Sequence, residues 1–488
     1  MIKSKSTTGS HCEERSQTEL KAGRLGVGAL VFSVVSAMAP LTTITGMFPF
    51  GFIYGNGTGY PVAYLLAMTV LILFSVGYLT MMRHVKSAGA FYALVSRGLS
   101  GKAGGCSALV MLLGYNASQV AMQGMFGAVT QDFMHTYFAV DLPWWIYCFF
   151  SIFAIGMLGY RKVDFSLAVL AFLVVGEFLI VAAVDSSVIV HTASTFNLAS
   201  FELDNVLSGS LPLALLMAIG SFLGFETTAL YSEEAKNPEK TIPRATYLSL
   251  FVIGIFYCFS GVCVLNGMGF DQSIDRFKGM SDTTQFIYIL ANDFISPSMT
   301  IYVHFLLITS TFASMLAFHN AAARYFYVLG REGVLPSALG TTHHKHASPY
   351  RGSMLQTFIA VSVISFFAIL KLDPMSTLFA WLGSVSILGI ISVTALVSYA
   401  VIVFFFKHRG LESNALSTRV APTIAAVLLT GISVSIVKNF GLFSGASGWI
   451  GVALPMMIPL FGVLGWLAAA RLKAKDASLY QSLGQNRY

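Results

Sequence analysis

The sequence predicts an all-α protein that crosses a membrane many times. Of its 488 residues, 56% are hydrophobic and 10% are charged, whereas a soluble domain carries about 25% charged residues. A helix needs about 20 apolar residues to cross the hydrocarbon of a bilayer, and segments of this kind recur along the whole chain. The alternating apolar pattern of a membrane β-barrel is absent from the sequence. We therefore expect lipid to surround most of the protein surface.

Twelve apolar segments are long enough to span a bilayer, and each is bounded by a loop that contains Gly, Pro, Asn or charged residues. Their expected ranges are Leu25–Phe52, Tyr60–Met82, Gly105–Gln131, Pro143–Tyr160, Phe165–Val190, Leu211–Tyr231, Pro243–Met268, Phe294–Tyr325, Ser353–Leu370, Pro374–Phe406, Val420–Val437 and Trp449–Arg471.

The distribution of lysine and arginine predicts the orientation. If the N-terminus is cytoplasmic, 25 of the 29 Lys and Arg residues fall in the tails and loops on that side, which is the bias known as the positive-inside rule. Residues 1–24 and 472–488 are then cytoplasmic tails of a multi-pass protein in a plasma membrane, the inner membrane if the source is bacterial. The net charge of +7 follows from the same bias, so it does not indicate a nucleic-acid partner.

No cofactor or metal is expected. The five cysteines show no CxxC spacing, and most lie in apolar runs, where small buried side chains are the usual reading. The histidines of 342–346 have no acid or cysteine beside them, as a metal site would need. The sequence also lacks a paired set of histidines or carboxylates at catalytic spacing, so we do not expect an enzyme.

Two of the predicted spans carry interruptions. Leu25–Phe52 has 28 residues, which as a helix would be about 42 Å long against a hydrocarbon core of about 30 Å. Its centre contains Pro40, which has no N–H to donate, so we expect a break there, with a simple proline kink as the alternative. The sixth span places Gly224 and Glu226 in the middle of an apolar run.

Breaks at corresponding positions of two halves indicate a transporter built from inverted repeats, with its substrate near the midplane. Five spans per repeat give 25–190 and 211–406, and the last two helices, 420–471, lie outside the repeat. The N–H groups that begin a half-helix attract a carboxylate, and free carbonyls attract an ammonium group or a cation. A zwitterionic amino acid has both groups.

Three segments resemble the amino acid–polyamine–organocation (APC) permeases. Phe222-Leu223-Gly224-Phe225-Glu226, followed by 233–245 (EEAKNPEKTIPRA), is similar to the family's GFE and EE-x-x-NP-x-x-x-IP-x-A. Residues 87–92 (SAGAFY) resemble its first cytoplasmic loop, and Arg324 with 330–336 (GREGVLP) resembles the loop after its eighth span. The resemblance implies a five-plus-five inverted repeat, a central site between the first and sixth helices, and proton or sodium symport or exchange. Many members have G-x-G at the first break, where this chain has 39–43 (APLTT).

The candidate substrate-binding residues are those at the two breaks, and a polar group on the third span is a candidate pocket lining. Hydrogen bonds between helices are the alternative for the polar group. The break residues are Ala39, Pro40, Leu41, Thr42, Thr43, Ser221, Phe222, Leu223, Gly224 and Phe225, and the polar group is Tyr115, Asn116 and Gln119.

Two acids lie deep in predicted spans, where ionisable groups are expensive and usually functional. For Glu226 we predict a gating or proton-linked role, with capping of the following half-helix as the alternative. Glu177 stands near the point of the fifth helix where several proton-coupled members of the resembled family carry a lysine. It is a candidate for proton exchange or contact with a cationic substrate, and a structural hydrogen bond is the alternative.

Together these features predict a secondary active transporter that imports an amino acid, with a proton as the coupling ion. Polyamine or amine uptake and amino acid exchange by the same fold are the alternatives. A channel would need a continuous polar lining or a repeated filter sequence. A passive facilitator with two six-span halves would carry a different basic signature after the second span.

Overall fold

The protein is described here by a computed structural model that covers residues 23–85, 89–160, 163–280, 282–343, 346, 348–411 and 414–485. Within these ranges the chain forms helices, loops and one isolated bridge between Leu25 and Ala235, so the predicted all-α class is confirmed. Several predicted features lie outside the described residues, namely most of the N-terminal tail, Ser87 and Ala88 of the first loop motif, the basic pair Arg161 and Lys162, His344 and Lys345, and the last three residues.

The long helices follow the apolar segments of the sequence. They are α2 (Val27–Met38), α3 (Pro40–Tyr54), α4 (Tyr60–Met82), α6 (Gly101–Phe138), α7 (Trp144–Tyr160), α8 (Val163–His191), α10 (Leu211–Gly220), α11 (Pro238–Gly267), α14 (Met299–Arg331), α15 (Tyr350–Ile369), α16 (Ala380–Lys407), α17 (Ala421–Lys438) and α19 (Gly448–Lys475).

Shorter helices occupy the loops and the breaks. They are α5 (Ala90–Gly98), α9 (Leu203–Val206), α12 (Ser273–Gly279), α13 (Phe286–Phe294), α18 (Phe440–Ser444), α20 (Ala477–Gln481), the 3-10 turns η1 (Gly57–Gly59), η2 (Ala199–Phe201), η3 (Phe225–Tyr231), η4 (Phe270–Gln272), η5 (Thr283–Gln285), η6 (Ser337–Gly340) and η8 (Arg409–Leu411), and the π turns η7 (Pro374–Phe379) and η9 (Leu416–Val420).

Ten helical segments within the described residues are long and apolar enough to cross a membrane. The predicted spans at Gly105–Gln131 and Pro143–Tyr160 correspond to α6 and α7, which are not among these ten; α6 has 38 residues and α7 has 17. The eighth span begins at Met299, five residues after the predicted start, because Pro297 separates it from α13. A multi-pass membrane protein is thus supported, and the count of twelve stays a prediction.

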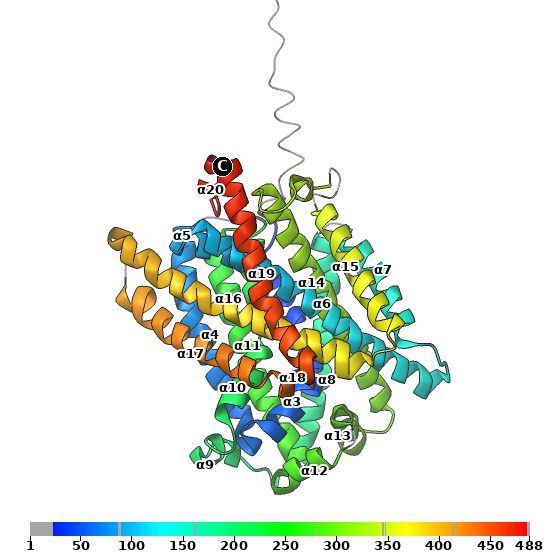
Figure 1. Cartoon of the computed structure of the whole chain (residues 1–488). Helices are drawn as coiled ribbons and strands as arrows, with labels where there is room; N and C mark the ends of the chain where they lie inside the picture. The colour runs from blue at the N-terminus through cyan, green and yellow to red at the C-terminus, as the bar shows by residue number, and fades with distance from the viewer. Residues whose placement is uncertain are drawn as a thin grey trace, which may run out of the picture.

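The helices form one bundle in which the interrupted segments are central. Helix α6 packs against α14, α16 and α19, while α2 packs against α8, α11 and α14. Figure 1 shows α19 crossing the front of the bundle, the C-terminus at one end, and α9, α12 and α13 gathered at the other end. The two interrupted segments, Val27–Tyr54 and Leu211–Tyr231, are mostly buried within this bundle.

Candidate functional site

The first predicted break lies at Ala39. Helix α2 ends at Met38, Ala39 has φ 44° and ψ 76°, and α3 begins at Pro40. The Ala39 N–H donates to Val35 O at 3.0 Å and to Ser36 O at 3.2 Å, so the last turn of α2 closes on itself. A left-handed alanine costs about 1–2 kcal/mol. The interruption is therefore confirmed, and the simple proline kink is wrong.

The second break replaces a stretch of α-helix with a turn and a 3-10 helix. Helix α10 ends at Gly220, Gly224 has φ 113°, and η3 follows from Phe225. The two breaks touch, because a Cβ atom placed on Gly224 would lie 2.5 Å from Ala37 Cβ. Glycine is required here both by its backbone angle and by this close approach. The prediction of an interruption in the sixth span is confirmed.

Glu177 of α8 caps the start of α3. The Leu41 N–H donates to Glu177 Oε2 at 3.2 Å, and the Ser310 hydroxyl of α14 donates to the same oxygen at 2.7 Å. Thr42 reaches Ser310 Oγ through both its N–H, at 3.3 Å, and its hydroxyl, at 2.9 Å. Glu177 is fully buried. The free N–H groups of the half-helix are thus held by side chains of the protein itself.

Glu226 caps its own half-helix. The Gly224 N–H donates to Glu226 Oε2 at 2.9 Å, and the Glu226 side chain is fully buried. This contact is the one that the capping interpretation of Glu226 requires. Seven of the predicted break residues lie around these two caps and do not line the cavity that runs from the breaks. They are Ala39, Pro40, Leu41, Thr42, Phe222, Gly224 and Phe225.

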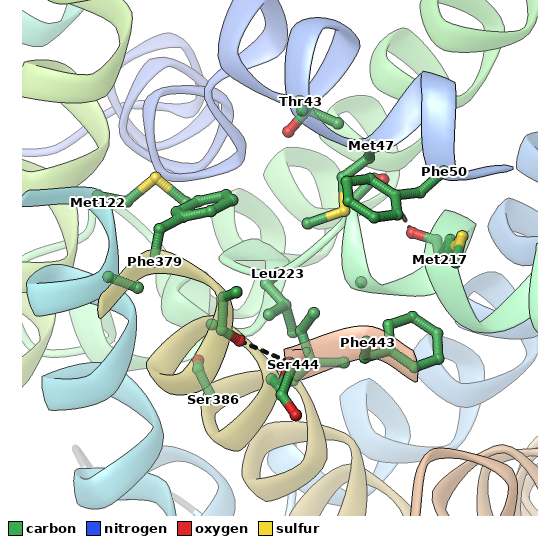
Figure 2. Close-up of a pocket in the computed structure, with 18 of the residues that line it drawn as sticks. Thr43, Met47, Phe50, Met122, Met217, Leu223, Phe379, Ser386, Phe443 and Ser444 are labelled. Atoms are coloured by element: carbon green, nitrogen blue, oxygen red, sulfur yellow. Dashed lines mark hydrogen bonds between the residues drawn. The ribbon is translucent and has the colours of Figure 1, made fainter. Parts of the chain in front are cut away.

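A cavity of about 520 Å³ runs from the two breaks toward the end of the bundle that carries α12 and α13. Figure 2 shows Thr43, Met47 and Phe50 of α3 facing Leu223, Phe379 and Ser386 across it. Of the predicted break residues, Thr43, Ser221 and Leu223 line the cavity. The lining is mainly apolar, with hydroxyl groups and one acid, Asp282. The lining also includes Met38, Ser118, Met122, Met217, Thr284, Phe318, Met375, Ser376, Ser384 and Ser444.

The polar group predicted on the third span lies beside the cavity and does not line it. Gln119 accepts a hydrogen bond from Gln356 of α15, the Asn116 amide donates to Leu112 O at 2.8 Å, and Tyr115 packs against the ring of Tyr325 at 5.6 Å. Of these contacts, the bond from Gln356 to Gln119 is a hydrogen bond between helices, which is the alternative interpretation of the polar group. The same helix, α6, instead presents Ser118, Ala121 and Met122 to the cavity.

Comparison with known proteins gives a match to the family model described as amino acid permease, over residues 31–467. This chain belongs to the amino acid permease family, within the APC superfamily. Three relatives are similar over parts of the chain. The low-affinity putrescine importer of Escherichia coli K12 is 26% identical over 353 residues, covering 69% of this chain and 74% of the importer.

The other two relatives match shorter segments. The human cystine/glutamate transporter is 27% identical over 139 residues, which is 28% of this chain and 26% of the relative. The methylthioribose transporter of Bacillus subtilis is 24% identical over 194 residues, covering 40% and 38% of the two chains. All three are transporters, and the solutes in their names differ. The family therefore supports transport by this permease without naming its solute.

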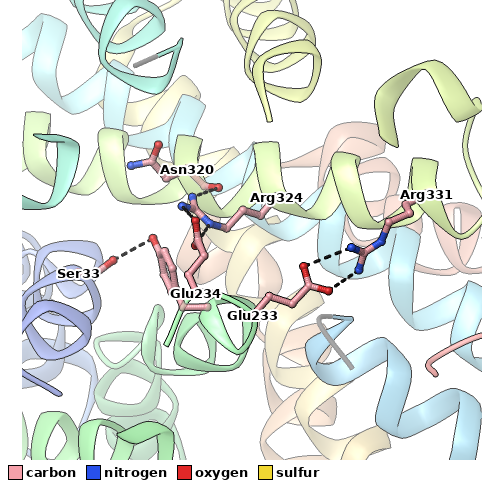
Figure 3. A network of polar contacts seen from close by, with 7 residues as sticks. Ser33, Glu233, Glu234, Asn320, Arg324 and Arg331 are labelled. Atoms are coloured by element: carbon pink, nitrogen blue, oxygen red, sulfur yellow. Dashed lines mark hydrogen bonds and ion pairs between the residues drawn. The ribbon is translucent and has the colours of Figure 1, made fainter. Parts of the chain in front are cut away.

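The loop motif of the permease forms a polar network on the side of the breaks that faces away from the cavity (Figure 3). Arg324 of α14 pairs with Glu234 at 3.0 Å, with both side chains almost fully buried, and its guanidinium lies over the ring of Tyr231 at 4.4 Å. Arg331 pairs with Glu233 at 2.5 Å in a half-buried setting. Ser33 of α2 donates to the Tyr231 hydroxyl at 3.1 Å.

The same loop holds the start of the first helix. The backbone N–H groups of Arg24 and Leu25 both donate to Glu234 O, at 2.9 and 3.0 Å, and Lys236 N–H donates to Leu25 O at 2.8 Å. The motif therefore ties three parts of the permease together, namely the entry to α2, the end of η3 and helix α14. This end of the permease is closed by packed, paired side chains.

One buried acid of the permease was missed by sequence reasoning. Asp185, in the C-terminal half of α8, is 2% exposed and accepts a hydrogen bond from the Ser260 hydroxyl of α11 at 2.6 Å. It lies within the predicted fifth span, so an inventory of every acid inside a span would have found it. The serines of α16 that line the cavity were also missed, because serine in an apolar helix usually bonds its own backbone.

Proposed function

We propose that this permease is a secondary active carrier that moves a small amine-bearing solute, an amino acid or a related amine, into the cell by alternating access. The observation that carries the proposal is the cavity at the contact of the two interrupted helices, with Thr43 on one and Ser221 and Leu223 on the other. Sites at such breaks are typical of transporters built from inverted repeats. The proposal includes twelve spans, the repeats 25–190 and 211–406, and cytoplasmic termini.

The end of the bundle that carries the Arg324–Glu234 pair is closed, and this favours a carrier over a channel or a passive facilitator. The cavity reaches the breaks, and beyond them the Arg324–Glu234 pair and the strand-like contact of Leu25 with Ala235 fill the path. A channel requires a continuous lining through the molecule. We propose that this end is cytoplasmic, that the observed conformation is open toward the outside, and that breaking the network opens the inner side.

Uptake into proteoliposomes tests the proposal. Labelled amino acids and amines are offered to the full-length purified protein with and without an inward proton gradient. We expect saturable uptake of at least one solute, with accumulation that the gradient drives and that is accompanied by current. Passive, ohmic current without saturation would overturn the carrier in favour of a channel or facilitator.

We predict that Glu177→Gln removes proton-driven accumulation while saturable exchange of the solute continues. The glutamine oxygen still accepts from Leu41 N–H and from Ser310, so α3 remains capped, but the side chain no longer binds and releases a proton. Uptake with and without the gradient measures the effect against the wild type. Full proton-driven accumulation by the variant would show that Glu177 is not the coupling group.

A further inference from the structure

The carboxylate of an amino acid needs partners that the cavity does not supply. Among the described residues that line it, none is a lysine, an arginine or a histidine. Burying a carboxylate without an opposite charge or several hydrogen-bond donors is costly. Two other kinds of donor lie at the breaks, namely the backbone N–H groups at the starts of the half-helices and the hydroxyl groups of the lining.

Those backbone donors are already used. At the start of α3, Pro40 has no N–H, Leu41 N–H donates to Glu177, Thr42 N–H donates to Ser310, and Thr43 N–H donates to Ala39 O at 2.8 Å. The Glu177 carboxylate therefore occupies the first N–H group of the half-helix, within one turn of the lining residues Met38 and Thr43.

The second half-helix is filled in the same way. At the start of η3, Gly224 N–H donates to Glu226 Oε2, Phe225 N–H donates to Phe222 O, and Thr227 N–H donates to Gly224 O. Both helix starts at the contact of the breaks are thus neutralised by acids of the chain itself, Glu177 and Glu226. The N–H groups of Gly224, Phe225 and Thr227 are therefore not free for an incoming anion.

The hydroxyl groups of the cavity are mostly acceptors. Thr43 donates its hydroxyl hydrogen to Met38 O at 2.7 Å, Ser221 donates to Met217 O at 2.9 Å, and Ser384 donates to Ala380 O at 2.7 Å. Once a hydroxyl has donated, only its oxygen lone pairs are free for a ligand.

Three further hydroxyl groups of the lining also donate within the protein. The hydroxyls of Ser444, Ser376 and Thr284 donate to Phe440 O, Asp373 Oδ1 and Asp282 Oδ1, and Ser118 and Ser386 share one hydrogen bond. Methionine sulfurs are weak acceptors and phenylalanine faces attract cations. Within the part of the chain that the structure describes, the one charged lining residue is the acid Asp282. The cavity therefore suits a ligand that donates hydrogen bonds and carries positive charge.

We propose that Glu177 fills the anion subsite of this permease and that the transported solute is an alkylammonium cation without a free carboxylate. The inference rests on the proposed function and narrows its substrate class. Glu177 is here a specificity-determining residue: it occupies the N–H group of Leu41 and thereby excludes the carboxylate of an amino acid, while the acceptors around Thr43 and Ser384 receive the ammonium group.

Matched pairs of amino acids and their decarboxylated amines test the proposal on the wild-type protein. The pairs are leucine and isoamylamine, phenylalanine and phenethylamine, and lysine and cadaverine, with the amino acid methyl esters as a third arm. Binding to the full chain is measured by thermal shift and transport by counterflow. We expect each amine to bind at least about tenfold more tightly than its amino acid, with the esters resembling the amines.

The outcomes separate this inference from the proposed function. Saturable transport of amino acids that equals or exceeds transport of the amines overturns the inference and leaves the carrier intact. Absence of binding and transport for every member of the panel overturns both.

Two variants at Glu177 then test the assigned residue. Glu177→Ala frees the Leu41 N–H, and we expect the preference for the amine over the amino acid to fall by about tenfold or more. Glu177→Gln keeps an acceptor oxygen on that N–H, and we expect the wild-type preference. Counterflow reports both, since it needs no proton gradient. If the wild type and Glu177→Ala prefer the amine over the amino acid equally, Glu177 does not set the selectivity. If both variants lose this preference, the charge of Glu177 sets the selectivity, and its occupation of the Leu41 N–H does not.

Discussion

Replacing Gly224 with alanine is expected to abolish transport. Any L-residue is strained at φ 113°, and the new Cβ would lie 2.5 Å from Ala37 Cβ. Strain of this backbone kind costs about 1–3 kcal/mol, and the overlap must in addition push the two breaks apart. Because Ser221 and Leu223 line the cavity on one side and Met38 and Thr43 on the other, the shift changes the site itself. Initial uptake rates at equal protein amounts measure the effect.

Two variants separate strain from contact. Gly220→Ala lies four residues earlier, also on the cavity wall but at an ordinary backbone angle, and its Cβ would meet only side-chain carbons of Ile387, the nearest at 3.2 Å, so transport should stay near the wild-type rate. Ala37→Gly combined with Gly224→Ala removes the overlap and keeps the backbone strain. We expect the double variant to recover part of the uptake. Wild-type uptake by Gly224→Ala alone would contradict the close contact of the breaks.

The breaks were predictable from the sequence because their causes are local. A proline in the middle of a 28-residue apolar run cannot continue the hydrogen-bond ladder, and a glycine beside a buried acid permits angles that other residues avoid. The interruption lies at Ala39 because the ring of Pro40 disfavours helical backbone angles at the residue before it. The contact of Gly224 with Ala37 depends on packing across 187 positions of sequence, and no local pattern contains it.

The residues lining the cavity were harder to predict for a related reason. Tyr115, Asn116 and Gln119 are conspicuous polar residues, yet Tyr115 packs against α14, Gln119 bonds to α15, and α6 presents Ser118 and Met122 to the cavity instead. The rotation of a helix about its axis is set by packing against neighbouring helices. When most of a span is apolar, its few polar residues do not show which side of the helix faces the cavity. The partner of Glu177 likewise required the placement of three helices.

Replacing Arg324 with alanine should destabilise the permease more than any other change in the loop network. The substitution leaves the Glu234 carboxylate, 3% exposed, without its partner, and removing one member of a buried pair costs about 3–5 kcal/mol. It also removes the guanidinium from the face of Tyr231. Thermal unfolding of the purified protein should show a clear fall in midpoint temperature, while Arg331→Ala, in the more exposed pair with Glu233, should change the free energy of unfolding by about 1 kcal/mol or less.

The double variant Arg324→Met with Glu234→Met distinguishes a gate from a structural support. Apolar residues of similar volume often restore the stability lost by breaking a buried pair, so the midpoint should return toward the wild-type value. The specific attraction that closes this end is still missing, and the inward-open state should become more populated. A cysteine at Ser33, which is 2% exposed and bonded to Tyr231 in the closed arrangement, reports that state through thiol labelling from the inner side. If the cysteine at position 33 is labelled faster in the double variant than in the wild-type background, while the midpoint temperature is restored, the Arg324–Glu234 pair is the inner gate. If the labelling rate is unchanged, the pair only stabilises the fold, because removing a gate must expose position 33.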